Sequence, residues 1–179
     1  NSGVLMNKDA DYTRSIHYVL GTEYLPNTTT RFTLEVFYKQ YRNVPVSVKD
    51  GISLANMGGD FGVIGNEDVI TSGKGKSYGF ELFAQQKLTK RFFGTLSYTF
   101  FISRFSGLNN KEIASAWDNR HLLSFIWGYK FNKNWELGLK FRFQGGAPYT
   151  PFDLTSSQLN YLTYSIGILN YDQLNSEKL

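Results

Sequence analysis

The chain has 179 residues, of which 17% are aromatic and only 19% are charged, and it contains no cysteine. Its length suits one domain, and no stretch approaches the roughly 20 apolar residues of a membrane-spanning helix, so we exclude a helical membrane protein. The net charge of +4 is spread along the chain without a run of like charges, which argues against a nucleic-acid partner.

The first predicted hairpin runs from about Ile16 to Tyr41 and turns at residues 25–30. Apolar and polar residues alternate along both strands, which is typical of strands with one buried face. Pro26 cannot donate to a neighbouring strand and Asn27 favours turns, so the first strand must end there. The apolar face carries Tyr18, Leu20, Thr22, Tyr24, Phe32, Leu34, Val36 and Tyr38, and the polar face carries His17, Gly21, Glu23, Arg31, Thr33, Glu35 and Lys39.

The second predicted hairpin runs from about Tyr78 to Ile102, with apolar residues alternating along both strands. Hairpin strands pair with like faces together, so an odd number of residues must separate Leu88 from Phe92. We therefore predict a three-residue turn at residues 89–91.

The third predicted hairpin covers residues 123–143 and turns at residues 132–134. Its apolar face carries Leu123, Phe125, Trp127, Tyr129, Phe131, Trp135, Leu137, Leu139, Phe141 and Phe143. The register that this turn implies places Lys130 opposite Glu136, and an opposite-charge pair is what a correct register favours.

The three short turns alternate with long segments, namely residues 42–76, residues 104–119 and the stretch after Gly145. Short turns at one end and long loops at the other are typical of outer-membrane barrels, and aromatic residues cluster beside the short turns. We therefore predict an all-β fold: an antiparallel, up-and-down transmembrane β-barrel segment of about six strands in three hairpins, with short periplasmic turns and long extracellular loops. The alternative is a soluble β-sandwich, although its strands average about five to six residues rather than ten.

We expect residues 1–179 to form a single partial barrel domain, because the six predicted strands are fewer than the roughly eight of the smallest usual barrels. The N-terminal residues contain no export signal. Both ends fall in polar, loop-like sequence, so the chain is expected to be a fragment.

Two glycine patterns resemble nucleotide-binding motifs, but neither has the required context. Residues 59–65 read Gly-x-x-Gly-x-x-Gly, and residues 75–77 read Gly-Lys-Ser. Both motifs need a helix directly after the glycines, and no helical periodicity follows either of them. We therefore predict no cofactor.

The sequence also gives no support for catalysis or metal binding. His17 and His121 lie in different hairpins, without cysteines or suitably spaced carboxylates. We therefore predict no metal site and no catalytic residues, and we expect the protein not to be an enzyme. The polar faces carry Glu23, Glu35 and Glu81, which we expect to form ionic ladders with Arg31, Lys39 and Lys87.

Four motifs occur in order along the chain: Gly79-x-Glu81, Leu96-Ser97-Tyr98-Thr99-Phe100, Ala116-Trp117-Asp118-Asn119-Arg120-His121 and Gly145-Gly146-Ala147-Pro148-Tyr149-Thr150-Pro151. Through these motifs the chain resembles the C-terminal barrel region of TonB-dependent outer-membrane receptors, in the branch related to starch-utilisation transporters. The resemblance extends from about His17 to Asn175.

The resemblance implies a barrel of about 22 strands, plugged by an N-terminal domain, in the outer membrane of a Gram-negative bacterium. Such a receptor imports a bulky or scarce nutrient, for example a glycan, siderophore or peptide, with energy delivered through TonB. We expect the plug, the TonB box, the earlier strands and the terminal strand that ends in an aromatic residue to be missing from this fragment. The implied partners are the TonB complex, acting through the plug, the outer-membrane lipid and the nutrient, with a surface lipoprotein as a further candidate.

The resemblance gives this segment the role of barrel wall and substrate-facing loops. Four loop aromatics, Phe61, Trp117, Tyr149 and Phe152, are candidate substrate-binding residues because flat rings stack on sugars, although loop packing is their ordinary use. A passive porin or an adhesin barrel is the alternative function within membranes, and a soluble carbohydrate-binding β-sandwich is the alternative outside them.

Overall fold

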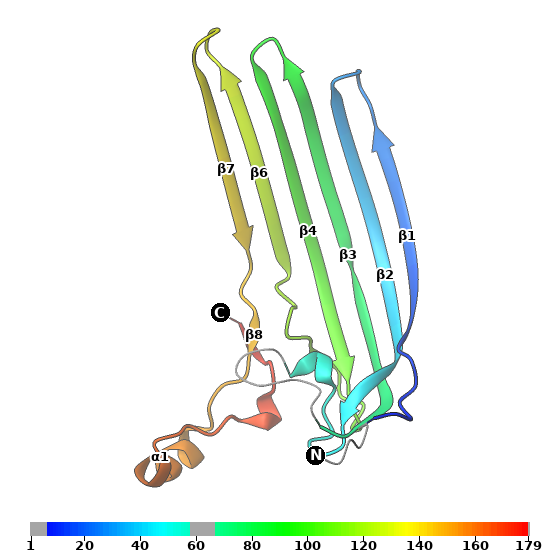
Figure 1. Cartoon of the computed structure of the whole chain (residues 1–179), viewed down its shortest axis with the longest axis vertical. Coiled ribbons are helices and arrows are strands. Elements are labelled where there is room, and N and C mark those ends of the chain that lie inside the picture. Colours follow the sequence, from blue (N-terminus) through cyan, green and yellow to red (C-terminus); the bar gives the residue numbers. More distant parts are fainter. Residues whose placement is uncertain (1–6, 58–66, 179) are drawn as a thin grey trace.

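The computed structural model describes residues 7–57 and 67–178, which form mainly one tall antiparallel sheet (Figure 1). Its six long strands are β1 (Arg14–Tyr24), β2 (Thr30–Ser47), β3 (Val69–Thr89), β4 (Phe92–Ser106), β6 (His121–Lys130) and β7 (Glu136–Gln144). They lie side by side in the order β1-β2-β3-β4-β6-β7, and the short β5 (Ile113–Ala114) pairs with β4. The chain therefore runs up and down through the sheet, as predicted, and β1 and β7 form the two edges of the described sheet.

All three predicted hairpins are present, and in each of them the predicted like faces meet. Tyr24 pairs with Phe32 in the first hairpin, and Lys130 pairs with Glu136 in the third. The ion pair between Lys130 Nζ and Glu136 Oε2 spans 3.5 Å. The predicted charge pair of the third hairpin is therefore confirmed.

Asparagine side chains close the first and third turns. The Oδ1 atom of Asn27 accepts hydrogen bonds from the backbone N–H groups two and three residues on, at 2.9 and 2.8 Å. Asn132 does the same in the third turn, at 2.8 and 2.9 Å. A side chain that bonds its own backbone in this way favours a turn over a continuing strand.

The second turn differs from its prediction. Thr89 pairs with Phe92, so the loop contains only Lys90 and Arg91, and Lys90 adopts a left-handed φ of 41°. The register shifts between Gln86 and Thr89, which marks a β-bulge. A bulge adds one residue to one strand, so it restores the pairing of like faces that a two-residue loop alone would reverse. The predicted three-residue turn is wrong, while the predicted pairing of faces is confirmed.

The central strands are longer than predicted. β2, β3 and β4 contain 18, 21 and 15 residues, and they include residues 42–47, 69–76 and 104–106, which the sequence pattern assigns to loops. In these extensions apolar and polar residues no longer alternate, although the backbones remain paired. The extensions lie beyond the apolar band, so neither of their faces needs to be apolar. The 3-10 helix η1 (Leu54–Asn56) lies between β2 and β3, and β5 lies between β4 and β6.

Residues 145–178 leave the large sheet and contain a helix that the sequence pattern does not predict. They form β8 (Pro148–Tyr149), α1 (Leu154–Tyr164), the 3-10 helix η2 (Tyr171–Gln173) and β9 (Glu177–Lys178), and β8 pairs with β9. Asp153 caps α1, because its Oδ1 accepts a hydrogen bond from the backbone N of Ser156 at 2.9 Å. Apolar side chains such as Leu162 are exposed rather than aligned in one buried stripe, so the helical signal is weak.

In the described part of the chain, no helix is both long and apolar enough to cross a membrane.

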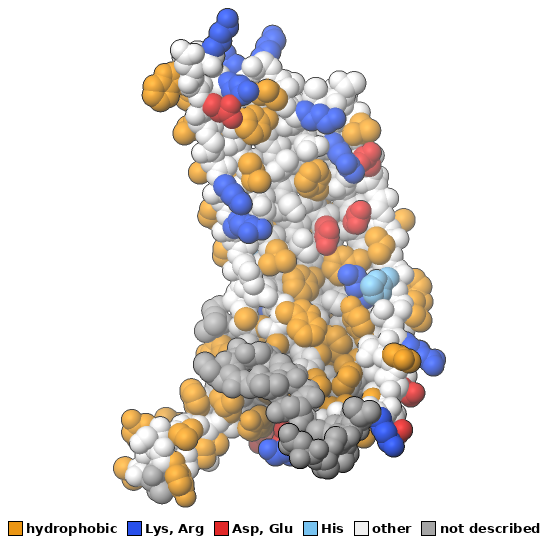
Figure 2. Space-filling model, in the orientation of Figure 1, with side chains coloured by type: hydrophobic (Ala, Val, Ile, Leu, Met, Phe, Trp, Pro, Cys, Tyr) orange, Lys and Arg blue, Asp and Glu red, His pale blue; other side chains and the backbone are white. Residues whose placement is uncertain are grey.

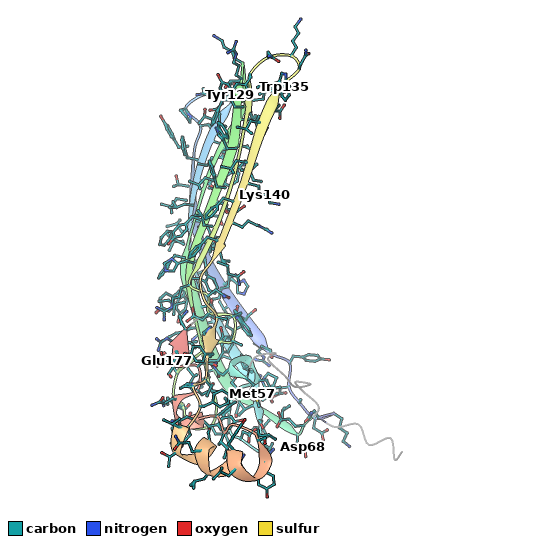
Figure 3. The ribbon with its side chains drawn as sticks, turned by 90° about the vertical axis from the view of Figure 1, so that its left-hand side faces the viewer. Met57, Asp68, Tyr129, Trp135, Lys140 and Glu177 are labelled. Carbon is teal, nitrogen blue, oxygen red and sulfur yellow. The ribbon has the colours of Figure 1, made fainter. Side chains whose placement is uncertain are left out.

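The sheet has almost no core of its own. Among the described residues, only Val44, Val46 and Phe105 are buried hydrophobic side chains, and all three lie at the long-loop end. Seen edge on, the sheet is a single layer, with Tyr129 and Trp135 beside the short turns and Met57, Asp68 and Glu177 at the other end (Figure 3).

The apolar face is exposed along its whole height. Its exposed side chains include Tyr18, Leu20, Tyr24, Phe32, Leu34, Val36, Tyr38, Tyr78, Leu82, Leu96, Trp135, Leu137, Leu139, Phe141 and Phe143. A soluble β-sandwich would bury such a face against a second sheet, but the only other sheet of the described residues is the two-residue pair of β8 and β9. This face therefore suits contact with lipid.

A new charge should reduce folding stability more on the apolar face than on the opposite face, when both positions lie at the same level of the sheet. Leu82→Arg places a charge on the apolar face, and Ser97→Arg places one on the opposite face, beside Phe83 in the neighbouring strand. We expect the leucine variant to lose about 2–4 kcal/mol of folding stability in lipid and the serine variant to lose much less. Urea titration of folding into lipid vesicles measures both, and equal losses would contradict the assignment of faces.

Candidate substrate-facing surface

The face of the sheet opposite the apolar face is polar, and in a barrel it lines the lumen. Figure 2 shows this face, with charged side chains spread over its short-turn half and middle and hydrophobic side chains gathered towards the long-loop end. Lys140 projects from this face when the sheet is seen edge on (Figure 3). A ligand inside the barrel would therefore meet two chemically different zones of wall.

Two carboxylates face each other in the middle of the lumen face. Glu35 on β2 is the cross-strand partner of Glu81 on β3, and Gly21 lies on the other side of Glu35. Within the described part of the chain neither carboxylate forms an ion pair, so the predicted ionic ladder is confirmed only for Glu23, which pairs with Arg31 at 2.5 Å. The lumen wall is therefore locally acidic at this height.

Four rings form a cluster on the lumen face near the long loops. This lumen aromatic cluster consists of His17, Tyr41, Phe105 and Trp117. The ring centroids of Tyr41 and Phe105 are 5.4 Å apart, and those of Phe105 and Trp117 are 5.7 Å apart with the rings edge to face. His17 meets Tyr41 at 6.3 Å. These separations are typical of favourable aromatic contacts.

Gly75 makes the cluster possible. Tyr41, Gly75 and Phe105 lie in one row across β2, β3 and β4, so the two rings start from strands about 10 Å apart. A Cβ atom on Gly75 would collide with the Phe105 ring, which shows that this ring occupies the space of the missing side chain. The glycine thus lets rings from non-adjacent strands meet.

The members of the cluster differ in exposure. The Phe105 side chain belongs to the buried core, whereas Trp117 remains 50% exposed. Phe105 therefore anchors the cluster, and about half of Trp117 stays accessible to solvent. An exposed flat ring beside polar wall is the usual geometry for stacking on a sugar or another flat ligand.

The structure does not bring the four predicted loop aromatics together. Only Trp117 lies in the lumen aromatic cluster. Phe61 falls outside the described residues. Tyr149 lies in β8, and Phe152 is 64% exposed beside Gly167, without aromatic contact to the cluster. His17, Tyr41 and Phe105 were missed as candidates. His17 and Tyr41 share the first hairpin, but the alignment of Tyr41 with Phe105 depends on the register between hairpins, which no short turn determines.

A buried carboxylate fixes the segment that carries Trp117. The Asp118 side chain is fully buried, and its Oδ2 lies 3.4 Å from Arg120 Nε and 3.9 Å from Lys178 Nζ. Lys178 also donates to the backbone carbonyl of Asp118. Burial lowers the pKa of Lys178, and the negative charge of Asp118 opposes this shift. Asp118 therefore ties the loop before β6 to the C-terminal strand β9.

Two asparagines extend this polar framework. The Asn119 side chain donates to the Gly145 carbonyl at 2.8 Å, which joins the Asp-Asn-Arg-His motif to the Gly-Gly-Ala-Pro motif. The Asn175 side chain donates to the carbonyls of Asn56 and Ala114, at 2.6 and 2.8 Å. These bonds connect the loops between strands with residues 145–178, so the long-loop end is a packed platform. The motif residues 118–119 thus hold loops in place.

The described residues offer no cluster of histidine, cysteine or carboxylate side chains that could hold a metal ion. Residues 75–77, which read Gly-Lys-Ser, lie inside β3 and are followed by strand rather than helix. The Gly-x-x-Gly-x-x-Gly pattern of residues 59–65 lies outside the described residues.

Removal of the buried charge should loosen the long-loop end. Asp118→Asn keeps the size of the side chain but leaves Lys178 and Arg120 without their anion. We expect a loss of about 1–3 kcal/mol of stability, less than for a fully buried pair because the two cations are 32% and 33% exposed. Thermal unfolding of the intact protein in detergent measures this loss. The exposed Asp172→Asn is the matched control, and an equal loss in both variants would contradict the role of Asp118.

The comparison with known families agrees with this geometry. Residues 2–176 match the family described as TonB dependent receptor-like, beta-barrel, which covers nearly the whole chain. No curated protein matches the chain. The family resides in the outer membrane of Gram-negative bacteria and works with the TonB complex. The chain therefore belongs to the TonB-dependent receptor β-barrel family, and its sheet is a segment of outer-membrane barrel wall, with periplasmic short turns and extracellular long loops.

Proposed function

We propose that this wall belongs to an active transporter that imports a glycan, within the starch-utilisation branch of the family. The observation that carries the proposal is the lumen aromatic cluster, in which the half-exposed Trp117 packs on the Phe105 ring at the long-loop end. Sugar rings have apolar faces that stack on such rings. The four sequence motifs that resemble this branch support the same assignment.

The acidic zone of the lumen wall suits the same ligand. Carboxylates such as Glu35 and Glu81 accept hydrogen bonds from sugar hydroxyls. Along β2, Tyr41 lies six positions after Glu35, a distance of about 20 Å. A glycan of several sugar units could therefore contact both zones at once, whereas an anionic ferric siderophore would be repelled by the carboxylate pair.

The proposed activity is transport driven by the TonB complex, without a chemical reaction on the substrate. TonB would act through a plug domain inside the barrel, and a surface lipoprotein would deliver or retain the glycan at the long loops. A passive porin or adhesin remains the competing function. It needs neither TonB nor a stacking site, so the energy dependence of uptake separates the two.

Loss of the exposed indole ring should weaken glycan binding. Trp117→Ala removes the stacking surface but leaves the buried Phe105 anchor in place. We expect about 5- to 150-fold weaker binding of a maltooligosaccharide, because the stacking of one flat ring on an aromatic side chain contributes about 1–3 kcal/mol. Calorimetry on the intact receptor measures the affinity. Trp135→Ala, beside the short turn at the other end, is the matched control and should bind normally.

Uptake of the same sugar in cells with and without TonB completes the test. The proposal predicts that uptake requires TonB and falls with Trp117→Ala. Unchanged uptake without TonB would favour a passive pore. Normal sugar affinity in Trp117→Ala, or binding of a siderophore or peptide in place of the sugar, would overturn the proposed substrate class.

A further inference from the structure

Basic side chains gather on the lipid-facing side of the wall, behind the lumen aromatic cluster. The outer cationic cluster consists of Arg14, Arg42, Lys74, Lys76 and Arg104, which lie on the same face as the apolar band. Arg14, Arg42 and Lys74 form one cross-strand row, and Lys76 and Arg104 are partners in the adjacent row. The motifs and the proposed transport leave this cluster without a role.

The arrangement places like charges directly opposite each other. Such cross-strand pairs destabilise a sheet unless an anion lies between them. Within the described residues one carboxylate approaches the cluster: Glu112, which pairs with Lys76 at 2.7 Å. The other four cations have no ion-pair partner among the described residues, so the cluster carries an excess of positive charge.

The position of the cluster along the strands indicates which layer of the membrane it contacts. Tyr18, Tyr38 and Tyr78 form a row across β1, β2 and β3, with neighbouring ring centroids 6.4 Å apart. Tyrosines in such a row mark the boundary between hydrocarbon and headgroups. The row of Lys76 lies two residues beyond the tyrosines, about 7 Å further out, and the polar layer of a bilayer leaflet is about 5–8 Å thick.

The cluster also encloses a space. A hollow of about 520 Å³ is lined by four of the five cluster residues, Arg42, Lys74, Lys76 and Arg104, and by Tyr38, Gln40, Tyr41, Gly75, Ser106 and Glu112. Tyr38 of the tyrosine row is one of its lining residues, so a molecule in the hollow could place its acyl chains along the apolar band below. A free anion in solution would use none of that apolar surface.

We propose that the outer cationic cluster binds the phosphate-bearing headgroup of a lipid in the outer leaflet. Arginine and lysine side chains would hold the phosphate oxygens by charge-assisted hydrogen bonds, and the acyl chains would cover the apolar face below the tyrosine row. The bound lipid supplies the anion that relieves the repulsion between the paired cations.

Lipid retained by the intact receptor tests the proposal. The variant R42Q/K74Q/R104Q removes three charges and keeps the ion pair between Lys76 and Glu112. The probes are an outer-leaflet glycolipid that carries phosphate groups and the same lipid after enzymatic removal of its phosphates. In native mass spectrometry, we expect the phosphorylated lipid to bind the wild-type protein and to bind the variant at least about tenfold more weakly.

The matched control removes three charges from the lumen face, as K39Q/K140Q/R142Q, and should retain the lipid. Thermal unfolding gives a second readout. The phosphorylated lipid should raise the melting temperature of the wild-type protein but not that of R42Q/K74Q/R104Q, whose stability without lipid should not fall.

Three results would overturn the proposal. They are equal lipid retention by wild-type protein and R42Q/K74Q/R104Q, equal loss in the lumen control, and equal binding of the dephosphorylated lipid. Displacement of the lipid by an equal concentration of inorganic phosphate would show a site for free phosphate instead. Because lipid binding is measured without sugar, failure here leaves the proposed glycan transport intact.

Discussion

The structure depends on one constraint: the sheet has no interior, so lipid must cover its apolar face. Only a few hydrophobic side chains of the described residues are buried, and these lie at the long-loop end. In water such a single layer would expose an apolar surface far beyond what soluble proteins tolerate. The alternation of side chains is therefore the principal requirement on the strands. A register slip of one residue would turn every apolar side chain into the lumen.

This requirement explains the geometry of the second turn. The two-residue loop at Lys90 and Arg91 would by itself set unlike faces together, and the bulge between Gln86 and Thr89 corrects the register. The chain thus has two ways to satisfy the same constraint, and sequence alternation cannot distinguish them. Turn length is free to vary as long as the faces agree.

The long-loop end is built differently, because it extends beyond the lipid and must hold itself together. Buried polar groups such as Asp118 and Asn56 stabilise this end, whereas contact with lipid stabilises the membrane-spanning part of the sheet. Here consecutive residues of one strand project to opposite faces of the sheet. Tyr41 belongs to the lumen aromatic cluster and Arg42 to the outer cationic cluster, and Phe105 and Arg104 repeat the pattern two strands away. The proposed sugar contacts and the proposed lipid contacts are therefore back to back.

The sequence was sufficient to predict the parts of the fold that depend on local pattern. The three hairpins and the pairing of Lys130 with Glu136 follow from alternation and a short turn. The register between β2 and β3 does not, because a long segment connects these strands, and so the row of Tyr41, Gly75 and Phe105 was not foreseen. The helix α1 was missed because its apolar residues form no stripe. Trp117 was a candidate by residue type alone, and its partners required the structure.

The periodicity of water access along one strand distinguishes most directly between a wall with lipid on one face and a sheet with water on both faces. The chain contains no cysteine, so single cysteines can be introduced from residue 94 to residue 102 of β4 in the intact protein in membranes. A charged thiol reagent should label Thr95, Ser97, Thr99 and Phe101, which face the lumen, and should leave Gly94, Leu96, Tyr98, Phe100 and Ile102 unlabelled, because these positions face lipid. Labelling of both sets, or of the second set alone, would contradict a wall with lipid on one face and water on the other.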